Sequence, residues 1–425
     1  MKNNISKGIF LVFAALSFFK ASALDVPTVP KDSKEIGQFI SFGTMDSDVA
    51  TVVTYDPQGN FYVGGITEGT LSGATGEGGF FIRAYTPDGR EMWTRQFGSE
   101  VFGELEGIAV DPKGHLYVVG VSYGCLNALC RGPRGVSFLN KYDLKGTLLW
   151  SRSLSRFEAS NSMSVAVDSK TREVYVALSS YLENLQDTSD NIAILKFDES
   201  GEELWSKSFG LSNESELNAI TVDEKGHFAI FGSTMSTFPG QSKVGSTDLF
   251  VRMYDAKGKE LWTKQFGSKG YDNVVAAEAD AQGNLYIMGN TAHNKPLTGQ
   301  TESGLFIRKY TDQGEEKWTR VLPNSVSTEK FGSFALDKKG NAHVFTRSEE
   351  APSKMETEPT PMPSQMRAYD PDGKELWVKD VAGPYFIYDM AVNNQGVVAV
   401  VGEKSIDPSN PEMSTRDAFI YIKQP

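Results

Sequence analysis

The chain has 425 residues, of which 40% are hydrophobic and 23% are charged, and its formal net charge is −12. This acidic balance argues against a nucleic-acid-binding protein, which needs a basic face, and against adhesion to an anionic membrane surface. A chain of this length usually forms two or three domains, although an internal repeat can override that expectation.

Residues 1–23 are predicted to form a secretory signal peptide. A basic start and an apolar run over 8–19 precede the small residues Ala21 and Ala23, which fit a cleavage site. The apolar run is too short to span a bilayer comfortably, and an uncleaved membrane anchor is the alternative. Cleavage would remove three lysines and no acids, moving the net charge from −12 to −15. We expect an exported mature chain, periplasmic or extracellular and without a transmembrane segment, that begins with a linker over 24–34.

From residue 36 onward the sequence repeats every 55 to 59 residues. All six tryptophans occupy one position of the repeat, and each follows a glycine by four residues. They are Trp93, Trp150, Trp205, Trp262, Trp318 and Trp377. A second marker begins a tight turn in each repeat. Its copies are Asp56, Asp111, Asp168, Asp223, Asp280, Asp337 and Asn393.

Each period contains four strand-like runs that are rich in β-branched and aromatic residues and bounded by Gly, Pro, Asp and Asn. No long segment after residue 30 has helical periodicity. Four antiparallel strands per repeat, arranged radially, form a β-propeller blade, because a blade covers both of its apolar faces only between two neighbours. The sequence therefore predicts an all-β, seven-bladed β-propeller in a single domain over 35–425.

The two ends of the chain each contribute an incomplete unit. IGQFISFG at 36–43 copies the strand that elsewhere carries the tryptophan, with Gln38 in its place, and DAFIYIK at 417–423 is a third strand with no fourth strand after it. We predict that the N-terminal strand completes the C-terminal blade and closes the ring, which removes exposed sheet edges.

The repeat also predicts local packing. We expect each tryptophan to pack between neighbouring blades, beside the aromatic residue that ends the preceding strand, as Tyr85 does before Trp93. The third repeat departs from the pattern at 168–173, where one extra residue and no glycine predict a local bulge.

The links between second and third strands are long and differ from blade to blade, whereas the other hairpin links are short. In an up-and-down blade these long links all emerge on one face, which we call the variable-loop face. Binding residues occur disproportionately on loops held by a rigid scaffold, so this face is the candidate functional surface. One of its loops carries Cys125 and Cys130, which predict a disulfide in an exported protein, with two free thiols as the alternative.

One acidic position recurs seven or eight residues before the turn marker, at the entrance of the innermost strand. Its copies are Asp48, Glu104, Glu216, Asp272 and Glu329. These acids could form a collar at the channel mouth that attracts a cation or a basic group, and they would then raise one another's pKa values. Alternatively, each could cap the backbone amides of its own crossover, which would lower its pKa. We expect the local caps.

Motifs for catalysis and metal binding are weak. The chain has only four histidines, of which His115 and His227 occupy equivalent turn positions, and no His-x-x-x-His, Cys-x-x-Cys or Gly-x-Ser-x-Gly pattern occurs. We therefore predict no catalytic residue, metal site or cofactor.

The phrases DLFVRMYDAKGKELWTKQFGS and AEADAQGNLYIMGNT resemble the bacterial β-propeller family of SBBP repeats over residues 36–423. The Tyr-Asp-x-x-Gly-x-x-x-Trp phrase also resembles the tryptophan-docking motif of quinoprotein propellers and of their eight-bladed relative in outer-membrane assembly. Seven repeats and the separation of Cys125 from Cys130 count against a quinoprotein, because quinone-dependent alcohol dehydrogenases have adjacent cysteines. The SBBP resemblance implies an exported, non-catalytic propeller.

Two classes of function follow. The first is a monomeric binding scaffold that uses the variable-loop face for a protein or a glycan. The second is a propeller enzyme, such as a lyase or a glycan hydrolase, with carboxylates at the channel mouth; a quinoprotein-like or outer-membrane-assembly-type periplasmic propeller is a further alternative. We expect the scaffold.

Overall fold

The computed structural model describes most of the chain from residue 37 onward. Contacts divide the chain into two units, Met1–Ile36 and Gly37–Pro425, and every described residue belongs to the second. The described ranges are 37–76, 78–98, 103–123, 135–154, 160–180, 192–209, 215–294, 301–322, 332–347, 364–381, 385–405 and 415–424. The predicted signal peptide and linker, together with Cys125 and Cys130, lie outside these residues.

Seven sheets form the blades of the predicted β-propeller, and the strands of each blade pair antiparallel in chain order. Blades 1 and 2 contain β2 (Asp48–Tyr55), β3 (Phe61–Thr67), β5 (Phe80–Tyr85) and β6 (Glu91–Phe97), then β7 (Gly103–Val110), β8 (Leu116–Ser122), β9 (Val136–Tyr142) and β10 (Leu148–Ser153). Blades 3 and 4 contain β11 (Ser160–Val167), β12 (Val174–Ser180), β13 (Ile192–Phe197) and β14 (Glu203–Phe209), then β15 (Ser215–Val222), β16 (Phe228–Thr234), β17 (Asp248–Tyr254) and β18 (Glu260–Phe266).

Blades 5 and 6 contain β19 (Tyr271–Ala279), β20 (Leu285–Asn294), β21 (Thr301–Tyr310) and β22 (Glu316–Leu322), then β23 (Gly332–Leu336), β24 (Ala342–Arg347), β25 (Ser364–Tyr369) and β26 (Glu375–Val381). Blade 7 contains β27 (Tyr385–Val392), β28 (Val398–Ser405), β29 (Arg416–Lys423) and, from the other end of the chain, β1 (Gly37–Phe42). Blade 1 has a fifth strand, β4 (Ala74–Thr75), which pairs parallel to β6.

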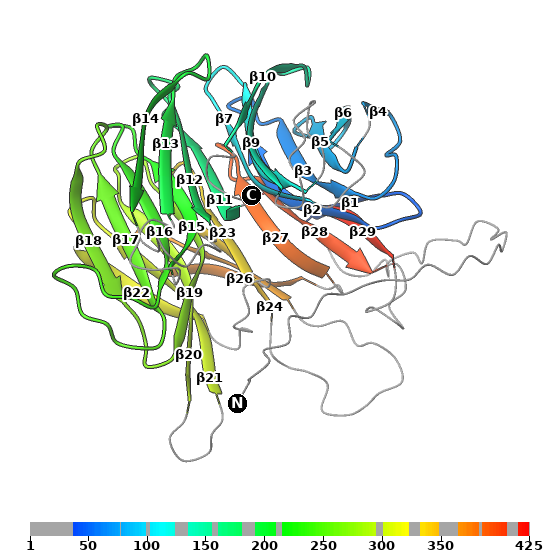
Figure 1. The fold of residues 1–425 in the computed structure, drawn as a ribbon. Helices are drawn as coiled ribbons and strands as arrows, with labels where there is room; N and C mark the ends of the chain where they lie inside the picture. Colours follow the sequence, from blue (N-terminus) through cyan, green and yellow to red (C-terminus); the bar gives the residue numbers. More distant parts are fainter. Residues whose placement is uncertain are drawn as a thin grey trace, which may run out of the picture. The chain divides into compact units, whose positions relative to one another are not determined.

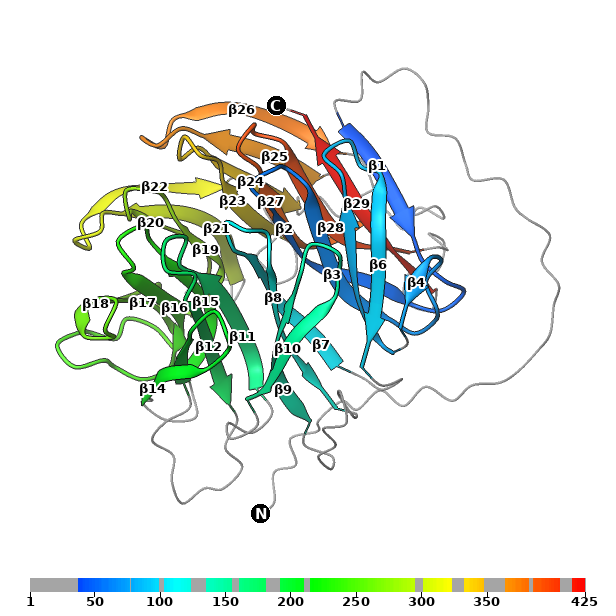
Figure 2. The same cartoon turned by 90° about the horizontal axis from the view of Figure 1, so that it is seen from above.

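The first strands of the blades surround the centre, and the fourth strands lie at the periphery (Figures 1 and 2). Consecutive first strands contact one another all the way round, and β27 contacts β2. No described residue lies in a helix, so none of these segments forms a helix long and apolar enough to cross a membrane.

The predicted closure of the ring is confirmed. β1 pairs antiparallel with β29 over its whole length, with Gln38 opposite Ile422 and Phe42 opposite Ala418. The rings of Phe39 and Tyr421 also contact each other across this pair, with their centroids 4.6 Å apart. The N-terminal strand therefore occupies the position of the fourth strand in blade 7.

In each blade a tight turn connects the first strand to the second, and the marker residue forms the hydrogen bonds across this turn. In blade 1 the Oδ1 of Asp56 accepts the backbone N–H groups of Gln58 and Asn60, both at 2.9 Å, and Gly59 takes a φ of 87°. The prediction of a bulge at 168–173 is wrong. The extra residue lengthens this turn instead, and Arg172 takes a φ of 60° where the other turns have glycine.

The tryptophans of blades 1 to 5 each pack against a glycine in the turn between the third and fourth strands of the next blade. The pairs are Trp93–Gly146, Trp150–Gly201, Trp205–Gly258, Trp262–Gly314 and Trp318–Gly373. A Cβ added to Gly373 would lie 2.7 Å from the Trp318 ring. The Trp93 indole also donates a hydrogen bond of 2.9 Å to the carbonyl of Leu144 in the same turn. Each indole thus fastens its blade to the next one.

The aromatic neighbour of the tryptophan differs from the predicted one. Trp93 lies 6.1 Å from the ring of Tyr62, in the second strand of its own blade, and it shares a buried cluster with Tyr142 of blade 2. Tyr85 instead stacks on Phe61 in a different cluster. The tyrosine at the end of a third strand therefore packs with the tryptophan of the preceding blade.

The two interfaces of blade 7 are variants of this contact. Gly89 of blade 1 lies against Gln38 and Ile40 of β1, so Gln38 takes the place of a tryptophan. On the other side, Trp377 of blade 6 has Lys423 over its ring at 4.4 Å, a cation–π contact in place of a glycine turn.

The docking contact predicts that Gly373→Ala is severely destabilising. The substitution forces alanine into a positive φ and places its Cβ against Trp318, and together these effects should cost about 2–5 kcal/mol in free energy of unfolding. Gly240→Ala is the matched control, because Gly240 has a similar φ of 75° but nothing within 4 Å of the added Cβ. Chemical denaturation measures both losses, and equal losses would contradict the docking role.

The closure predicts that a chain beginning at residue 43 is far less stable than one beginning at residue 36. The shorter chain leaves the edge of β29 unpaired and uncovers the hydrophobic cluster that contains Ile420 and Ile422. We expect a drop in melting temperature of roughly 10 °C or more, given 2–4 °C per kcal/mol in large domains. Calorimetry of the two chains tests this, and equal melting temperatures would refute it.

Candidate functional site

A central channel of about 610 Å³ runs between the first strands of all seven blades. Small and apolar residues form most of its wall. The polar side chains that line it include Glu106, Asn218, Glu278, Tyr388 and Asp389. The channel is therefore the concave feature of the described structure in which acidic groups are concentrated.

β-bulges shape this wall. In six blades the first strand shifts register against the second strand and leaves one extra residue unpaired, and in blades 1, 2, 4, 5 and 7 that residue lies in the channel wall. These five residues are Thr51, Glu106, Asn218, Val275 and Tyr388. A bulge redirects a side chain, which explains how these residues reach the channel from strands whose other residues are mostly apolar.

Each acid in the channel wall accepts a hydrogen bond from the backbone of the next blade. The Glu106 carboxylate accepts the N–H of Met163. Glu278 accepts the N–H of Leu336 at 2.8 Å, and Asp389 accepts the N–H of Val53 at 2.9 Å. These bonds connect blades 2 and 3, blades 5 and 6, and blades 7 and 1, so the acids hold the inner wall together.

Burial raises the pKa of these three carboxyl groups. The pKa of Glu106 rises to about 8, with added repulsion from Glu104 and Glu216. The pKa of Glu278 also rises to about 8, with Asp389 adding to the effect of burial, and that of Asp389 rises to about 7. At neutral pH the two glutamates are mostly protonated, so they can donate as well as accept hydrogen bonds.

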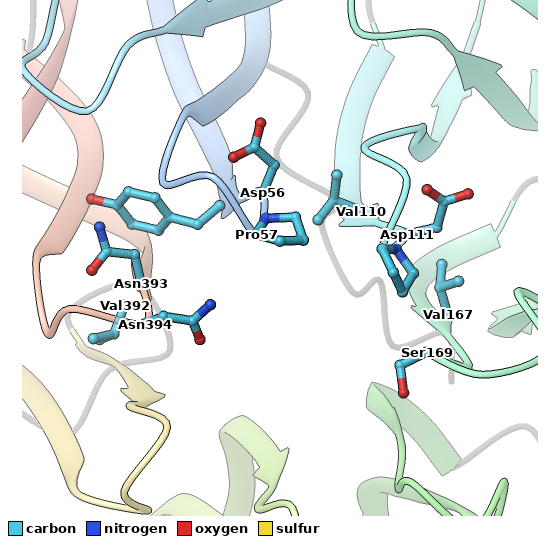
Figure 3. A pocket seen from close by; sticks show the side chains of 11 residues that line it. Asp56, Pro57, Val110, Asp111, Val167, Ser169, Val392, Asn393 and Asn394 are labelled. Carbon is cyan, nitrogen blue, oxygen red and sulfur yellow. The ribbon is translucent and has the colours of Figure 1, made fainter.

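A smaller pocket of about 220 Å³ lies at one end of the channel, beside the tight turns (Figure 3). It shares Tyr55, Val110, Val167 and Val392 with the channel wall, so it is a channel mouth. Asp56 at this mouth is occupied by its own turn, because its Oδ2 accepts the side-chain amide of Asn60 as well as the hydroxyl of Tyr62.

The predicted acidic position is divided between two environments. Asp48 and Asp272 are fully buried, whereas Glu104 and Glu216 are exposed, and Glu329 lies outside the described residues. The structure therefore does not gather them into one ring of equivalent side chains.

The two buried aspartates make local hydrogen bonds. Asp48 accepts the backbone N–H of Thr44 at 2.5 Å and its hydroxyl at 3.1 Å. Asp272 accepts the backbone N–H of Ser268 at 2.6 Å and its hydroxyl at 2.7 Å. The pKa of Asp48 is nevertheless raised, because burial outweighs the bonds from Thr67 and Thr44.

Sequence reasoning missed the acids that line the channel. Glu106, Glu278 and Asp389 precede their turn markers by five, two and four residues, so they have no constant repeat position. The available signal was a single acid within an otherwise apolar strand, as in VVAAEA, because such an acid needs a buried partner.

Among the described residues, Asp111, His115 and Glu199 form the one group of three or more His, Cys, Asp or Glu side chains that could hold a metal ion, with ligand atoms within 4.8 Å of one another. Arg172 donates to Glu199 at 2.9 Å, and the ammonium of Lys113 lies 3.5 Å away. These cations lower the pKa of Glu199 to about 2, with the Arg172 hydrogen bond as the main cause. The group is therefore an ion-pair network between blades 2 and 3.

Comparisons with known proteins support the fold. No family model matches the chain. Regulatory protein FlaEY of Caulobacter vibrioides is 26% identical over 207 residues, covering 42% of this chain and 21% of FlaEY, so the chain spans about a fifth of that relative. The solved Dos1 propeller has a TM-score of 0.50 and 10% identity, covering 90% of this chain and 93% of that one. A polysaccharide lyase of family PL25, an ulvan lyase, has a TM-score of 0.52 and 11% identity, and the match covers 91% of this chain and 96% of the lyase. At these identities the structural matches show the propeller fold alone.

The raised pKa of Glu278 predicts a pH-dependent gain in stability for Glu278→Gln. Between about pH 5 and 8 the unfolded state binds fewer protons than the folded state, so the wild-type free energy of unfolding falls as the pH rises, by at most about 1.4 kcal/mol per pH unit for one group. Glutamine has no charge to bury and should flatten this slope. Urea denaturation at pH 5 and pH 8 measures it, with exposed Glu315→Gln as the control, and parallel slopes would contradict the assignment.

Proposed function

We propose that the protein is an exported, non-catalytic propeller of the SBBP type that binds a protein or a glycan through its variable-loop face. Membership of that family and export rest on the sequence. The structural observation that carries the binding function is that two long loops on this face are fastened to the scaffold in the same way. These loops are 68–79 in blade 1 and 235–247 in blade 4.

A glutamine three residues after the tryptophan holds each loop. The Oε1 of Gln96 accepts the N–H of Leu71 at 2.8 Å, and its Nε2 donates to the carbonyls of Gly69 and Gly78, both at 3.0 Å. One side chain thus bonds three points along the loop of blade 1.

The loop of blade 4 is held in the same manner. Gln265 accepts the N–H of Phe238 and donates to the carbonyl of Ser236, both at 2.9 Å. Phe238 is only 3% exposed, and the guanidinium of Arg252 lies 5.0 Å from the centre of its ring. A loop fixed at a buried anchor presents its exposed residues in one arrangement, which reduces the entropy lost on binding.

Two apolar side chains on the blade 4 loop suit a partner surface. Met235 is 42% exposed and Val244 is 53% exposed, and they flank the buried anchor Phe238 in the sequence. Lys243 lies next to Val244 and is also exposed, so the loop combines apolar contact area with a positive charge. Interfaces commonly combine a central apolar contact with a polar rim.

The non-catalytic part of the proposal is supported by the channel. Its three acids each accept a hydrogen bond from a backbone amide of a neighbouring blade, which is a sufficient structural reason for their presence.

The binding proposal predicts that Met235→Ser with Val244→Ser weakens partner binding at least about tenfold, or about 1.4 kcal/mol, without loss of fold. The partner is first identified by glycan array and by capture from envelope extracts, and binding is then titrated with the purified partner. Leu261→Ser with Leu376→Ser is the control, because these leucines are similarly exposed, at 47% and 49%, but lie on outer strands. A loss only in the control variant would place the interface elsewhere.

A polysaccharide lyase is the second candidate. The observation that favours it is the near-neutral pKa of Glu278 and Asp389 in the channel, since a general acid or base works best near the ambient pH. Incubation with acidic polysaccharides would reveal unsaturated products by ultraviolet absorbance. Products that disappear in Glu278→Gln would favour the lyase over the scaffold.

A further inference from the structure

Two pairs of aspartates lie at equivalent positions on two blade interfaces. The first pair joins Asp248, which begins the third strand of blade 4, to Asp272, near the start of the first strand of blade 5. Gly267 lies between them, and a Cβ on this glycine would have an oxygen of both carboxylates within 3.1 Å. A side chain at this position would therefore have to displace one of the converging carboxylates.

The second pair lies where the ring closes. Asp417 belongs to β29, the third strand of blade 7, and Asp48 begins β2, the first strand of blade 1. A Cβ on Gly43, the counterpart of Gly267, would have an oxygen of both carboxylates within 2.8 Å. The two interfaces therefore share one construction.

In the Asp248–Asp272 pair all four carboxylate oxygens accept hydrogen bonds. Asp248 accepts the N–H groups of Val244 and Gly245 and the side-chain amide of Gln265, each at 2.9 Å. Asp272 accepts both bonds from Ser268 described above. Five donors compensate the two negative charges, so this pair needs nothing further.

Among the described residues, the Asp48–Asp417 pair has fewer donors: the bonds to it that the structure gives come from Thr44 and Thr67. Asp48 is 0% exposed, and the hydroxyl of Thr67 lies close enough to lower its pKa. Its buried Oδ1 nevertheless has no hydrogen bond of normal geometry among the described residues. The counterpart of Gln265 in β1 is Ser41, which is shorter and has no side-chain amide. The counterparts of Val244 and Gly245 are residues 413 and 414, which lie outside the described residues.

The surrounding charges leave the pair electrostatically uncompensated. Burial raises the pKa of Asp417, Asp48 raises it further, and Lys404, opposite Asp417 across the β28–β29 pair, only partly offsets both. Asp46 adds a further negative charge beside Asp48. A buried carboxylate beside a half-buried one is strongly favoured to take up a shared proton or a bound cation.

We propose that Asp48 and Asp417 bind a divalent cation of the calcium type, which ties blade 7 to blade 1 at the closure of the ring. Carboxylate oxygens are hard ligands, and calcium accepts the irregular geometry of two side chains from separate strands, whereas magnesium demands a near-ideal octahedron. Calcium takes six to eight oxygen ligands, so water completes the shell. A site with two carboxylates should bind with a dissociation constant of about 10⁻⁴–10⁻³ M, the range of extracellular modules.

The test measures the melting temperature of the mature chain at pH 7.5, once in chelator and once in calcium. The calcium concentration is about 2 mM, which is roughly twice the weakest dissociation constant expected. We expect calcium to raise the melting temperature of the wild type and magnesium to raise it less. Asp417→Asn should abolish the calcium increment while raising the melting temperature in chelator, because it removes one of two like charges. A purely structural aspartate would instead lose stability in chelator.

Asp272→Asn is the matched control at the equivalent interface, and it should lower stability while keeping the calcium increment. Asp48→Asn should also abolish the calcium increment. If that variant does not fold, terbium luminescence of Asp417→Asn still tests the site. Tyrosine-sensitised terbium emission should be displaced by calcium in the wild type and absent from Asp417→Asn. An equal calcium increment in Asp417→Asn would overturn the proposal. So would a wild type whose melting temperature responds to pH but not to calcium, which would show a shared proton. Neither result depends on whether the variable-loop face binds a partner.

Discussion

The contact between an indole and a glycine turn is the constraint on which the rest of the structure depends. A blade has two apolar faces, and the tryptophan at its outer strand fixes how far the next blade lies from it. The turn must have glycine, because a side chain would collide with the ring, and the positive φ of these glycines imposes the same choice independently. Repeating one contact around the ring sets the angle between blades, and the width of the channel follows from it.

The fold could be predicted from the sequence because the repeat carries it. Seven copies of a turn marker and six tryptophans predict the number of blades. The unmatched strands at 36–43 and 417–423 predict how the ring closes. The neighbour of the tryptophan could not be read in the same way. A register shift beside Tyr85 pairs Trp93 with Ala84, and since adjacent residues of a strand face opposite sides, Tyr85 points to the other face of the blade.

The candidate site was less predictable because it depends on bulges. A bulge reverses the alternation of buried and exposed residues at one point, and no residue type marks it, since Thr51, Glu106 and Val275 occupy the same structural position. The aspartates at 48 and 272 were found by their spacing, but their partners Asp417 and Asp248 belong to other strands, and only the packing of blades brings them together. The acidic position that the sequence marks is therefore divided between two separate aspartate pairs and two exposed glutamates, and the alternative of one acidic collar is not what the structure shows.

The closure of blade 7 also determines the order in which the strands can pair during folding. Strands within blades 1 to 6 pair with partners nearby in the chain, so these blades can form as soon as their residues are available. β1 pairs with Ala418–Lys423, which follows every other described strand in the sequence, and the ring stays open until that strand is available. Contacts of such long sequence separation form late in folding. A chain that stops before residue 416 would hold six complete blades and an unpaired β1 whose backbone is free to join a strand of another molecule.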